Sequence, residues 1–328
     1  MAPTMDWLER CRILVTNPDV GDPLTLLRAS LPHAAIAIVS QMDELAPAIA
    51  SHRPHVVFSF RLGAMTPANS GVLFSCPDTV WFHNGGAGIN HLPPWDTARI
   101  TVTNSGGVLS DFMAEYVLGG ILSLNFGLPR YRVNQQSRIW RPEPWSGVRG
   151  KMLLILGTGN IGQRVAVRAK VFGMRTIGFN SSGRPVAGFD HIVGRADLAD
   201  ALGEADFVSV HVPLTQATTG LLDKKLLAGM KPGAILINSS RGGVVDEAAV
   251  ADLLRAGTLK AALFDVFRIE PLPCDSPLWD VPNLSITPHS SELVDDWKDH
   301  IVRFFCDNLE RLRTGKPLLN VMQPDGSA

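Results

Sequence analysis

Leu153-Leu154-Ile155-Leu156 runs directly into the turn Gly157-Thr158-Gly159-Asn160-Ile161-Gly162, and apolar residues at helical spacing follow it. An aliphatic strand, a G-x-G-x-x-G turn and a helix in this order predict a dinucleotide-binding unit. The glycines allow the tight turn, the close approach of a pyrophosphate and the close packing of helix on strand. The alternative is an ordinary tight turn, since the bare motif is weak. Gly157, Gly159, Asn160, Ile161 and Gly162 are therefore predicted cofactor residues.

The rest of the chain alternates apolar strands with helices in the same way. Before the turn, strands are expected at 13–15, 36–39, 56–58 and 80–82, and helices at 24–31 and 44–51. After it, strands are expected at 151–156, 176–179, 207–210, 235–238, 262–266 and 284–286. Continuous apolar strands between helices predict parallel sheets that are covered on both faces. The predicted fold class is α/β, with two doubly wound parallel-sheet domains, one flavodoxin-like and substrate-binding, the other a Rossmann cofactor domain.

Two long helices indicate how the domains share the chain. A buried apolar helix is expected at about 110–128, and an amphipathic helix after His289, through about residue 312. The second helix lies beyond the cofactor alternation, so we expect it to fold back on the first domain. The predicted domains are 1–103 plus 290–328 for substrate and 104–289 for the dinucleotide, with two crossings between them.

Composition excludes several classes of function. The chain has 328 residues, 30 basic against 31 acidic, and no Lys/Arg run, which argues against nucleic acid or an anionic membrane as a partner. Cys11, Cys76, Cys274 and Cys306 lack metal-ligand spacing, which indicates free thiols, no metal and a reducing cytosol. The first twelve residues do not resemble a secretory signal, so a cytoplasmic location is expected.

The residues after the second cofactor-domain strand bear on the choice of dinucleotide. NAD-preferring versions of this unit place an acid about 20 residues after the first glycine. Here Asn180 stands at 180 − 157 = 23, followed by Ser181, Ser182 and Arg184. These residues can donate hydrogen bonds to a 2′-phosphate, and Arg184 can pair with it. NADP is therefore the predicted cofactor and NAD the alternative, in which case this is a polar turn with a solvated Arg184.

Three polar residues follow successive strands of the cofactor domain. Arg241 follows the apolar strand at 234–238, and Glu270 and His289 follow the next two strands. Ligands of open α/β sheets sit at the carboxyl ends of strands. An arginine can hold a carboxylate through two hydrogen bonds, and a histidine held by a carboxylate can exchange a proton near neutral pH. Each of these residues alone is typical of a structural or solvent-exposed position. Their occurrence after three successive strands predicts a catalytic site.

Over essentially its whole length the chain resembles the D-isomer-specific 2-hydroxyacid dehydrogenase family. The resemblance is carried by the segments 157–162, His211-Val212-Pro213-Leu214, Ser240-Arg241-Gly242, 265–271 and Pro288-His289. Within the family it most resembles the glyoxylate/hydroxypyruvate reductase A branch, through Arg138-Ile139-Trp140-Arg141-Pro142 and the segment 270–279.

The resemblance implies a role for each reacting residue. Arg241 would bind the carboxylate of a small 2-keto acid, and His289 would give a proton to the carbonyl oxygen. Glu270 would orient His289, and a hydride from nicotinamide C4 would yield the D-2-hydroxy acid. The resemblance also implies a homodimer that pairs through the helix near 110–128.

Further contacts are implied on both sides of the reaction. The segment Asn84-Gly85-Gly86-Ala87-Gly88-Ile89-Asn90 resembles the family's substrate loop, with Ala87 and Gly88 as backbone donors; the alternative is a flexible glycine linker. Arg61 and Trp140 are further substrate candidates. The remaining cofactor candidates are Val212, Pro213, Thr218, Ser239, Ser240, Arg241, Asp265, His289 and Ser291.

Some features depart from the family pattern and leave alternatives open. His289 is followed by Ser290-Ser291-Glu292 where many members have a glycine-containing run. A glutamate at 270 argues against the formate dehydrogenase branch, which uses glutamine there. Two other functions remain open, namely reduction of larger branched or aromatic 2-keto acids and a non-enzymatic, corepressor-like dinucleotide sensor.

Overall fold

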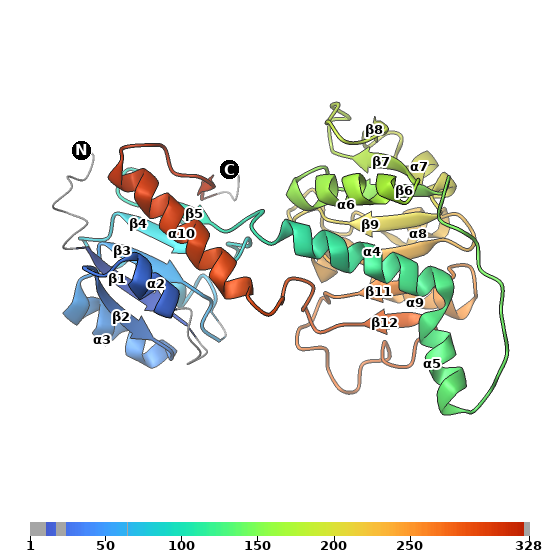
Figure 1. Cartoon of the computed structure of the whole chain (residues 1–328), viewed down its shortest axis with the longest axis horizontal. Helices are drawn as coiled ribbons and strands as arrows, with labels where there is room; N and C mark the ends of the chain where they lie inside the picture. The colour runs from blue at the N-terminus through green and yellow to red at the C-terminus, as the bar shows by residue number, and fades with distance from the viewer. Residues whose placement is uncertain (1–10, 18–23, 64, 325–328) are drawn as a thin grey trace. The chain divides into compact units, whose positions relative to one another are not determined.

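The computed structural model describes residues 11–17, 24–63 and 65–324, which form two compact units. The first unit comprises residues 1–109 and 294–328, and the second comprises residues 110–293 (Figure 1). Each is built on its own sheet.

The first unit has a six-stranded sheet in the order β13-β5-β4-β3-β1-β2. Its strands are β1 (Arg12–Thr16), β2 (Ala35–Val39), β3 (Val56–Ser59), β4 (Trp81–Asn84), β5 (Thr101–Asn104) and β13 (Val321–Met322). Its helices are α2 (Leu24–Ser30), α3 (Met42–His52), the 3-10 turn η1 (Ser70–Phe74) and α10 (Trp297–Arg313). All pairings are parallel except that of β13 with β5.

Alternate residues of these strands face different layers. Leu14, Val57 and Phe82 pack into one apolar cluster with Leu45 and Ile49 of α3. The neighbouring positions carry aromatic rings that stack on Phe305 of α10, with centroids 4.4 Å away for Phe58 and 4.9 Å away for Trp81. This alternation covers the sheet on both faces, and α10 lies beside α2 (Figure 1).

The second unit has a seven-stranded parallel sheet in the order β12-β11-β10-β9-β6-β7-β8. Its strands are β6 (Met152–Leu156), β7 (Arg175–Phe179), β8 (His191–Val193), β9 (Phe207–Val210), β10 (Ile235–Asn238), β11 (Ala261–Phe264) and β12 (Leu284–Ile286). Its helices are α4 (Ser110–Phe126), α5 (Leu128–Gln136), α6 (Asn160–Val171), α7 (Leu198–Glu204), α8 (Lys224–Ala228), α9 (Glu247–Arg255) and the 3-10 turn η2 (Gly242–Val244).

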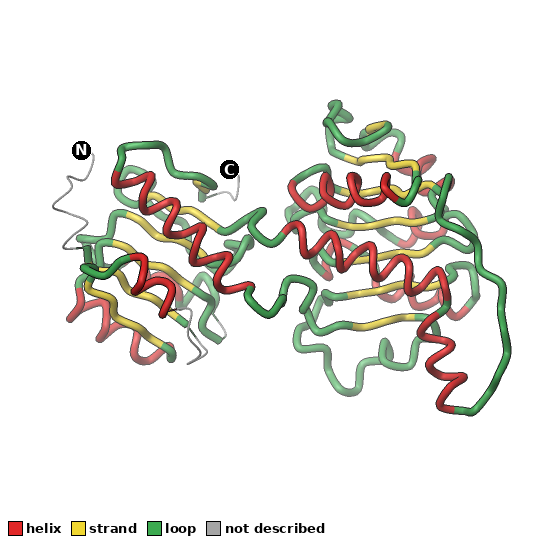
Figure 2. The backbone as a smooth tube through the Cα atoms, viewed as in Figure 1, coloured by secondary structure: helices red, strands yellow, loops and turns green. Residues whose placement is uncertain are grey.

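Helices cover both faces of this second sheet. Helices α4 and α6 share an apolar cluster with one face, and α7, α8 and α9 share another cluster with the opposite face. Strand order reverses between β6 and β9, which is the point where doubly wound sheets bind dinucleotides. Beyond α5 the chain runs from 137 to 151 without helix or strand (Figure 2).

The predicted α/β class is confirmed, with differences in detail. The sheet of the first unit gains an antiparallel edge strand, β13, and a strand β5 where only a crossing was expected. The helix expected after His289 begins only at Trp297, because the N–H groups of Ser290 and Ser291 donate to the Asp265 carboxylate instead. In the part of the chain that the structure describes, no helix combines the length and apolar character needed to span a membrane.

Candidate functional site

The glycine turn between β6 and α6 has the close contacts that its sequence predicts. Gly157 has a φ of +109°, and a side chain there would lie 2.9 Å from the carbonyl of His211. A Cβ on Gly162 would lie 1.9 Å from the carbonyl oxygen of Gly157. A Cβ on Gly159, by contrast, would meet no atom within 4 Å, and Gly159 is the N-cap of α6. The turn therefore leaves open space at the helix N-terminus, where a pyrophosphate would fit.

The turn after β7 is closed by Asn180. Its Oδ1 accepts from the N–H of Arg184 (3.1 Å) and the hydroxyl of Ser182 (3.1 Å), and its Nδ2 donates to the Arg184 carbonyl (2.9 Å). Ser181 and Arg184 are exposed, and in the described part of the chain the Arg184 guanidinium has no ion-pair partner. Asn180 thus shapes the turn, while Arg184 and the serines remain accessible to a ligand.

The other cofactor candidates follow the carboxyl ends of β9, β10, β11 and β12. Val212 and Pro213 begin the loop after β9, and the Thr218 hydroxyl closes it by donating to the Pro213 carbonyl (2.5 Å). The Ser240 hydroxyl donates to Asn238 (2.9 Å), and the Ser239 hydroxyl lies 3.4 Å from Nδ1 of His211. Burial lowers the pKa of His211 to about 3, so this imidazole beside the turn is neutral.

His289 and Glu270 form a direct pair. Nδ1 of His289 lies 2.8 Å from Oε2 of Glu270, and Oε1 of Glu270 accepts from the Phe267 N–H (2.8 Å). Both side chains are more than one-third exposed, at 39% and 35%. The carboxylate orients the ring through Nδ1, which leaves Nε2 to exchange a proton with a ligand.

A buried carboxylate, Asp265, holds the His289 turn in place. Its two oxygens accept from the Thr287 hydroxyl (2.6 Å) and from the N–H groups of Ser290 (2.8 Å) and Ser291 (3.1 Å). Its own carbonyl accepts from the His289 N–H (2.8 Å), where His289 has a φ of +53°. Asp265 and Ser291 are both buried, and the Asp265 carboxylate is engaged with the turn itself.

Tyr116 of α4 completes this network from another layer. Its hydroxyl lies 2.5 Å from the Thr287 hydroxyl. Thr287 donates its proton to the Asp265 carboxylate, so Tyr116 must be the donor to Thr287. Burial raises the pKa of Tyr116 to about 12, which keeps this phenol protonated.

Arg241 lies in a loop that packs against the Glu270 loop. The next residue, Gly242, is so close to the Phe267–Arg268 peptide that a Cβ would lie 2.0 Å from its carbonyl carbon. The Arg241 guanidinium donates to the Ser240 carbonyl (2.7 Å) and is partly exposed. Gly242 therefore allows the loop of the predicted carboxylate-binding arginine to contact the loop that carries Glu270.

The residues predicted to bind substrate lie in different places. Ala87 and Gly88 lie in the loop after β4 of the first unit, and Arg61 follows β3 and donates to the Met65 carbonyl (2.9 Å). Trp140 belongs to the second unit and is 99% exposed on the single chain.

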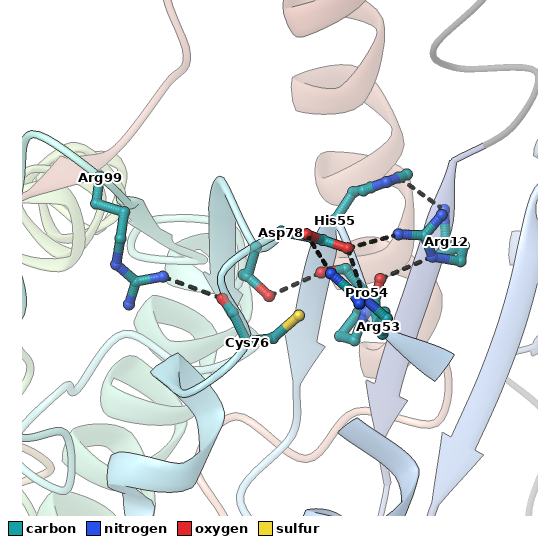
Figure 3. Close-up of polar contacts among 8 residues, drawn as sticks. Arg12, Arg53, Pro54, His55, Cys76, Asp78 and Arg99 are labelled. Carbon is teal, nitrogen blue, oxygen red and sulfur yellow. Dashed lines mark hydrogen bonds and ion pairs between the residues drawn. The ribbon is translucent and has the colours of Figure 1, made fainter. Parts of the chain in front are cut away.

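A separate cluster of charged side chains lies at the amino ends of the strands in the sheet of the first unit, whereas the loop of Ala87 and Gly88 follows the carboxyl end of β4. Asp78 accepts from Arg12 (3.0 Å) and from Arg53 (3.0 and 3.1 Å), and Arg99 donates to the Cys76 carbonyl (3.0 Å) (Figure 3). The hydrogen bond from Arg53 lowers the pKa of Asp78. Because Arg12 begins β1 and Arg99 precedes β5, this cluster lies at the amino ends of strands and ties loops together.

Sequence reasoning missed several residues of this arrangement. Tyr116 was unassigned and Thr287 had no role of its own, since their contact spans 171 positions. Glu247 was also missed; its carboxylate accepts from the Arg268 N–H (2.7 Å), and burial raises its pKa, with Glu270 adding to the effect. In the sequence, Glu247 could have been noticed because it follows Asp246, a typical N-cap residue, and so lies in the first turn of α9.

The family model described as D-isomer specific 2-hydroxyacid dehydrogenase, NAD binding domain, matches residues 118–291. The chain belongs to this family. The family and the nicotinamide dinucleotide-binding domain predicted from the sequence are thereby confirmed.

Among curated relatives, the glyoxylate/hydroxypyruvate reductase B of Pectobacterium atrosepticum is 34% identical over 244 residues, which cover 70% of this chain and 76% of that protein. A solved family protein from Aeromonas salmonicida is 35% identical, with a TM-score of 0.83, covering 96% of this chain and 99% of that one. Another, from Xanthobacter autotrophicus in complex with NADPH and MES, is 26% identical, with a TM-score of 0.78 and coverage of 95% and 98%.

The chain spans about half the length of the first curated relatives it matches, which are D-3-phosphoglycerate dehydrogenases of mycobacteria. Family membership therefore covers the fold and the dinucleotide-binding domain.

Proposed function

We propose that this member of the family reduces a small 2-keto acid to the D-2-hydroxy acid, with hydride from a reduced nicotinamide. The observation that carries the proposal is the 2.8 Å contact between His289 and Glu270. These residues follow β12 and β11, Arg241 follows the neighbouring strand β10, and the glycine turn follows β6 of the same sheet. When bound, the nicotinamide supplies the hydride to C2 of the keto acid. His289 gives its Nε2 proton to the carbonyl oxygen, and Arg241 holds the substrate carboxylate.

The substrate class we propose is glyoxylate or hydroxypyruvate, as in the glyoxylate/hydroxypyruvate reductase A branch. The segments 138–142 and 270–279 support this branch. The reductase names of relatives, such as that of Pectobacterium atrosepticum, support the small-substrate class. The first relatives carry a different name, D-3-phosphoglycerate dehydrogenase, so 3-phosphohydroxypyruvate belongs in any substrate panel.

We propose NADP as the preferred cofactor. Arg184 is exposed and unpaired in the described chain, beside Ser181 and Ser182, so a 2′-phosphate would gain a charge-assisted contact there. Asn180 contributes through the shape of the turn and carries no charge that would repel the phosphate. The NADPH in the Xanthobacter autotrophicus structure is consistent with this choice.

A homodimer in the cytoplasm is the assembly we propose. Helix α5 buries none of its residues, and large apolar side chains are exposed on it and on the segment that follows, namely Leu128, Val133, Ile139, Trp140 and Trp145. Exposed apolar surface of this extent is typical of an interface. Size-exclusion chromatography with light scattering tests the proposal, which a monomer at micromolar concentration contradicts.

One assay tests the reaction. The protein is mixed with NADPH or NADH and a panel of glyoxylate, hydroxypyruvate, phenylpyruvate and 3-phosphohydroxypyruvate, and absorbance of the reduced nicotinamide is followed. We expect the highest kcat/KM with NADPH and one of the first two acids. Arg184→Gln should raise KM for NADPH about tenfold, the value of a charge-assisted contact, and leave NADH unaffected. No turnover of any acid favours the sensor alternative.

A further inference from the structure

Two asparagines end neighbouring strands directly beneath the glycine loop of the first unit. Asn84 is the last residue of β4 and Asn104 the last of β5, and the two are partners in the parallel register. Both are buried, with 2% and 6% of their surface exposed. Buried amides are found where their hydrogen bonds are satisfied, so their partners show what they hold in place.

Their partners are the carbonyls of three successive loop residues. Nδ2 of Asn84 donates to the carbonyl oxygens of Gly86 (2.7 Å) and Gly88 (3.1 Å). Nδ2 of Asn104 donates to the carbonyl oxygen of Ala87 (2.7 Å). The three carbonyls between Gly86 and Gly88 are thus all bound from the side of the sheet.

This pattern fixes the direction of the loop's N–H groups. In a trans peptide the carbonyl and the following N–H point in opposite directions. The N–H groups of Ala87, Gly88 and Ile89 therefore point away from the asparagines. In the described part of the chain these three N–H groups have no hydrogen-bond acceptor. Three successive N–H groups directed to one side form a binding concavity for an anion.

Other contacts keep the asparagines and the loop ends in place. Oδ1 of Asn104 accepts from the Gly106 N–H (3.0 Å), which requires its Nδ2 to face Ala87. Nδ2 of Asn320 donates to the carbonyls of Asn104 (3.1 Å) and Gly106 (2.7 Å). The Gly85 N–H donates to the Ser59 carbonyl (2.8 Å), and the Ile89 side chain is buried in the core.

We infer that Asn84 and Asn104 are positioning residues, which hold the loop carbonyls inward so that the N–H groups of Ala87, Gly88 and Ile89 are preorganised for a substrate carboxylate. The inference rests on the proposed function. The asparagines themselves touch no substrate; they act on its affinity through the loop. Preorganised donors bind an anion without a cost for ordering the loop.

The first experiment separates affinity from turnover. Asn84→Ala and Asn104→Ala should each raise KM for glyoxylate about tenfold, the effect of one hydrogen bond, with kcat reduced less than about threefold. The dissociation constant for NADPH should stay within about twofold. The matched control is Asn308→Ala, which removes another buried amide that bonds a main-chain carbonyl, that of Leu319. This control should lower Tm without raising KM. An unchanged KM in both folded loop variants overturns the inference.

A second measurement does not depend on turnover or on the stability of the variants. In the ¹⁵N-labelled wild-type protein with NADPH, oxamate, a carboxylate that cannot be reduced, should shift the amide resonances of Ala87, Gly88 and Ile89. In the asparagine variants the same shifts should require about tenfold more oxamate. Absence of these shifts in the wild type overturns the inference. If glyoxylate and hydroxypyruvate are not turned over but the oxamate shifts occur, the proposed reaction fails and the loop inference stands.

Discussion

Glu270 accepts two hydrogen bonds that no neutral side chain can accept in the same way. Its two oxygens take the Phe267 N–H and Nδ1 of His289, each at 2.8 Å. Glu270→Gln keeps the shape of the side chain, but its amide NH₂ group is a donor and would face either the Phe267 N–H or Nδ1 of His289, which also donate. We expect kcat to fall roughly 10- to 100-fold, the value of a charge-assisted hydrogen bond, with an unchanged NADPH dissociation constant.

The reference variant for that measurement is His289→Ala. It should lower kcat roughly 10²- to 10⁴-fold, the usual contribution of general acid catalysis. Stopped-flow and steady-state assays on both variants test the pair. A Glu270→Gln enzyme with wild-type kcat would show that His289 needs no orienting carboxylate.

Tyr116 tests whether the network behind His289 matters for catalysis. Its hydroxyl donates to Thr287, which in turn donates to Asp265, and its pKa, raised to about 12 by burial, keeps it a donor at all working pH values. Tyr116→Phe should lower kcat about 3- to 10-fold, as expected for one neutral hydrogen bond, and leave NADPH binding unchanged.

The chain offers a matched control, because it contains only one other tyrosine. The Tyr131 hydroxyl donates to the Glu143 carbonyl instead (3.1 Å), so Tyr131→Phe should retain wild-type kcat. Equal losses in the two variants would mean that the Tyr116 effect is not specific to the His289 turn.

At the scale of the element, alanine substitutions at two glycines of the same turn should affect different properties, namely stability and cofactor binding. A Cβ on Gly162 would lie 1.9 Å from the Gly157 carbonyl oxygen, whereas one on Gly159 would enter open space. Gly162→Ala should therefore cost about 1–3 kcal/mol or more of folding free energy. Gly159→Ala should retain its Tm but weaken NADPH binding by about tenfold or more, because its methyl group occupies the pyrophosphate's space.

Thermal unfolding and fluorescence titration with NADPH separate these outcomes. A Gly159→Ala protein with wild-type NADPH affinity would mean that the dinucleotide does not approach this turn closely.

The elements read most reliably from the sequence are those with uniform apolar runs. The prediction matched β9 at 207–210 and β10 at 235–238, which are buried at every position, because buried parallel strands consist mainly of apolar residues. Strand β5, Thr101-Val102-Thr103-Asn104, has no such run, and its buried Thr103 hydroxyl is hydrogen-bonded to Trp81 and His83. Such pairings are set by tertiary contacts and leave no periodic signal.

The same distinction holds for the candidate site. Arg241, Glu270 and His289 could be proposed from the sequence because each follows a strand of one sheet. The structure places His289 and Glu270 in contact, and the catalytic roles of all three residues stay predictions. Tyr116 and Asn104 could not be proposed from the sequence in this way, because their partners lie on other elements and their roles are hydrogen bonds to a turn and a loop. Hydrogen bonds of this kind between distant elements leave no pattern in a single sequence.

At the scale of the whole molecule, each unit carries a histidine whose lowered pKa limits its stability in acid. Burial lowers the pKa from 6.5 to about 3 for His83 in the first unit and for His211 in the second. Between those pH values the unfolded chain binds a proton that the folded unit excludes. The free energy of unfolding is therefore complete above pH 6.5 and falls by about 1.4 kcal/mol per pH unit for each histidine as pH drops towards 3.

His83→Gln and His211→Gln should each flatten this dependence by about 1.4 kcal/mol per pH unit in urea unfolding measured from pH 7 to 4.5. Both variants also lose hydrogen bonds, so their stability at pH 8 is expected to fall, and the informative quantity is the slope. The exposed His33 and His191 provide matched controls in the same two units, and their Gln variants should keep the wild-type slope. If the slopes of the His83 and His211 variants equal that of the wild type, the acid sensitivity of the folded units comes from their carboxylates instead.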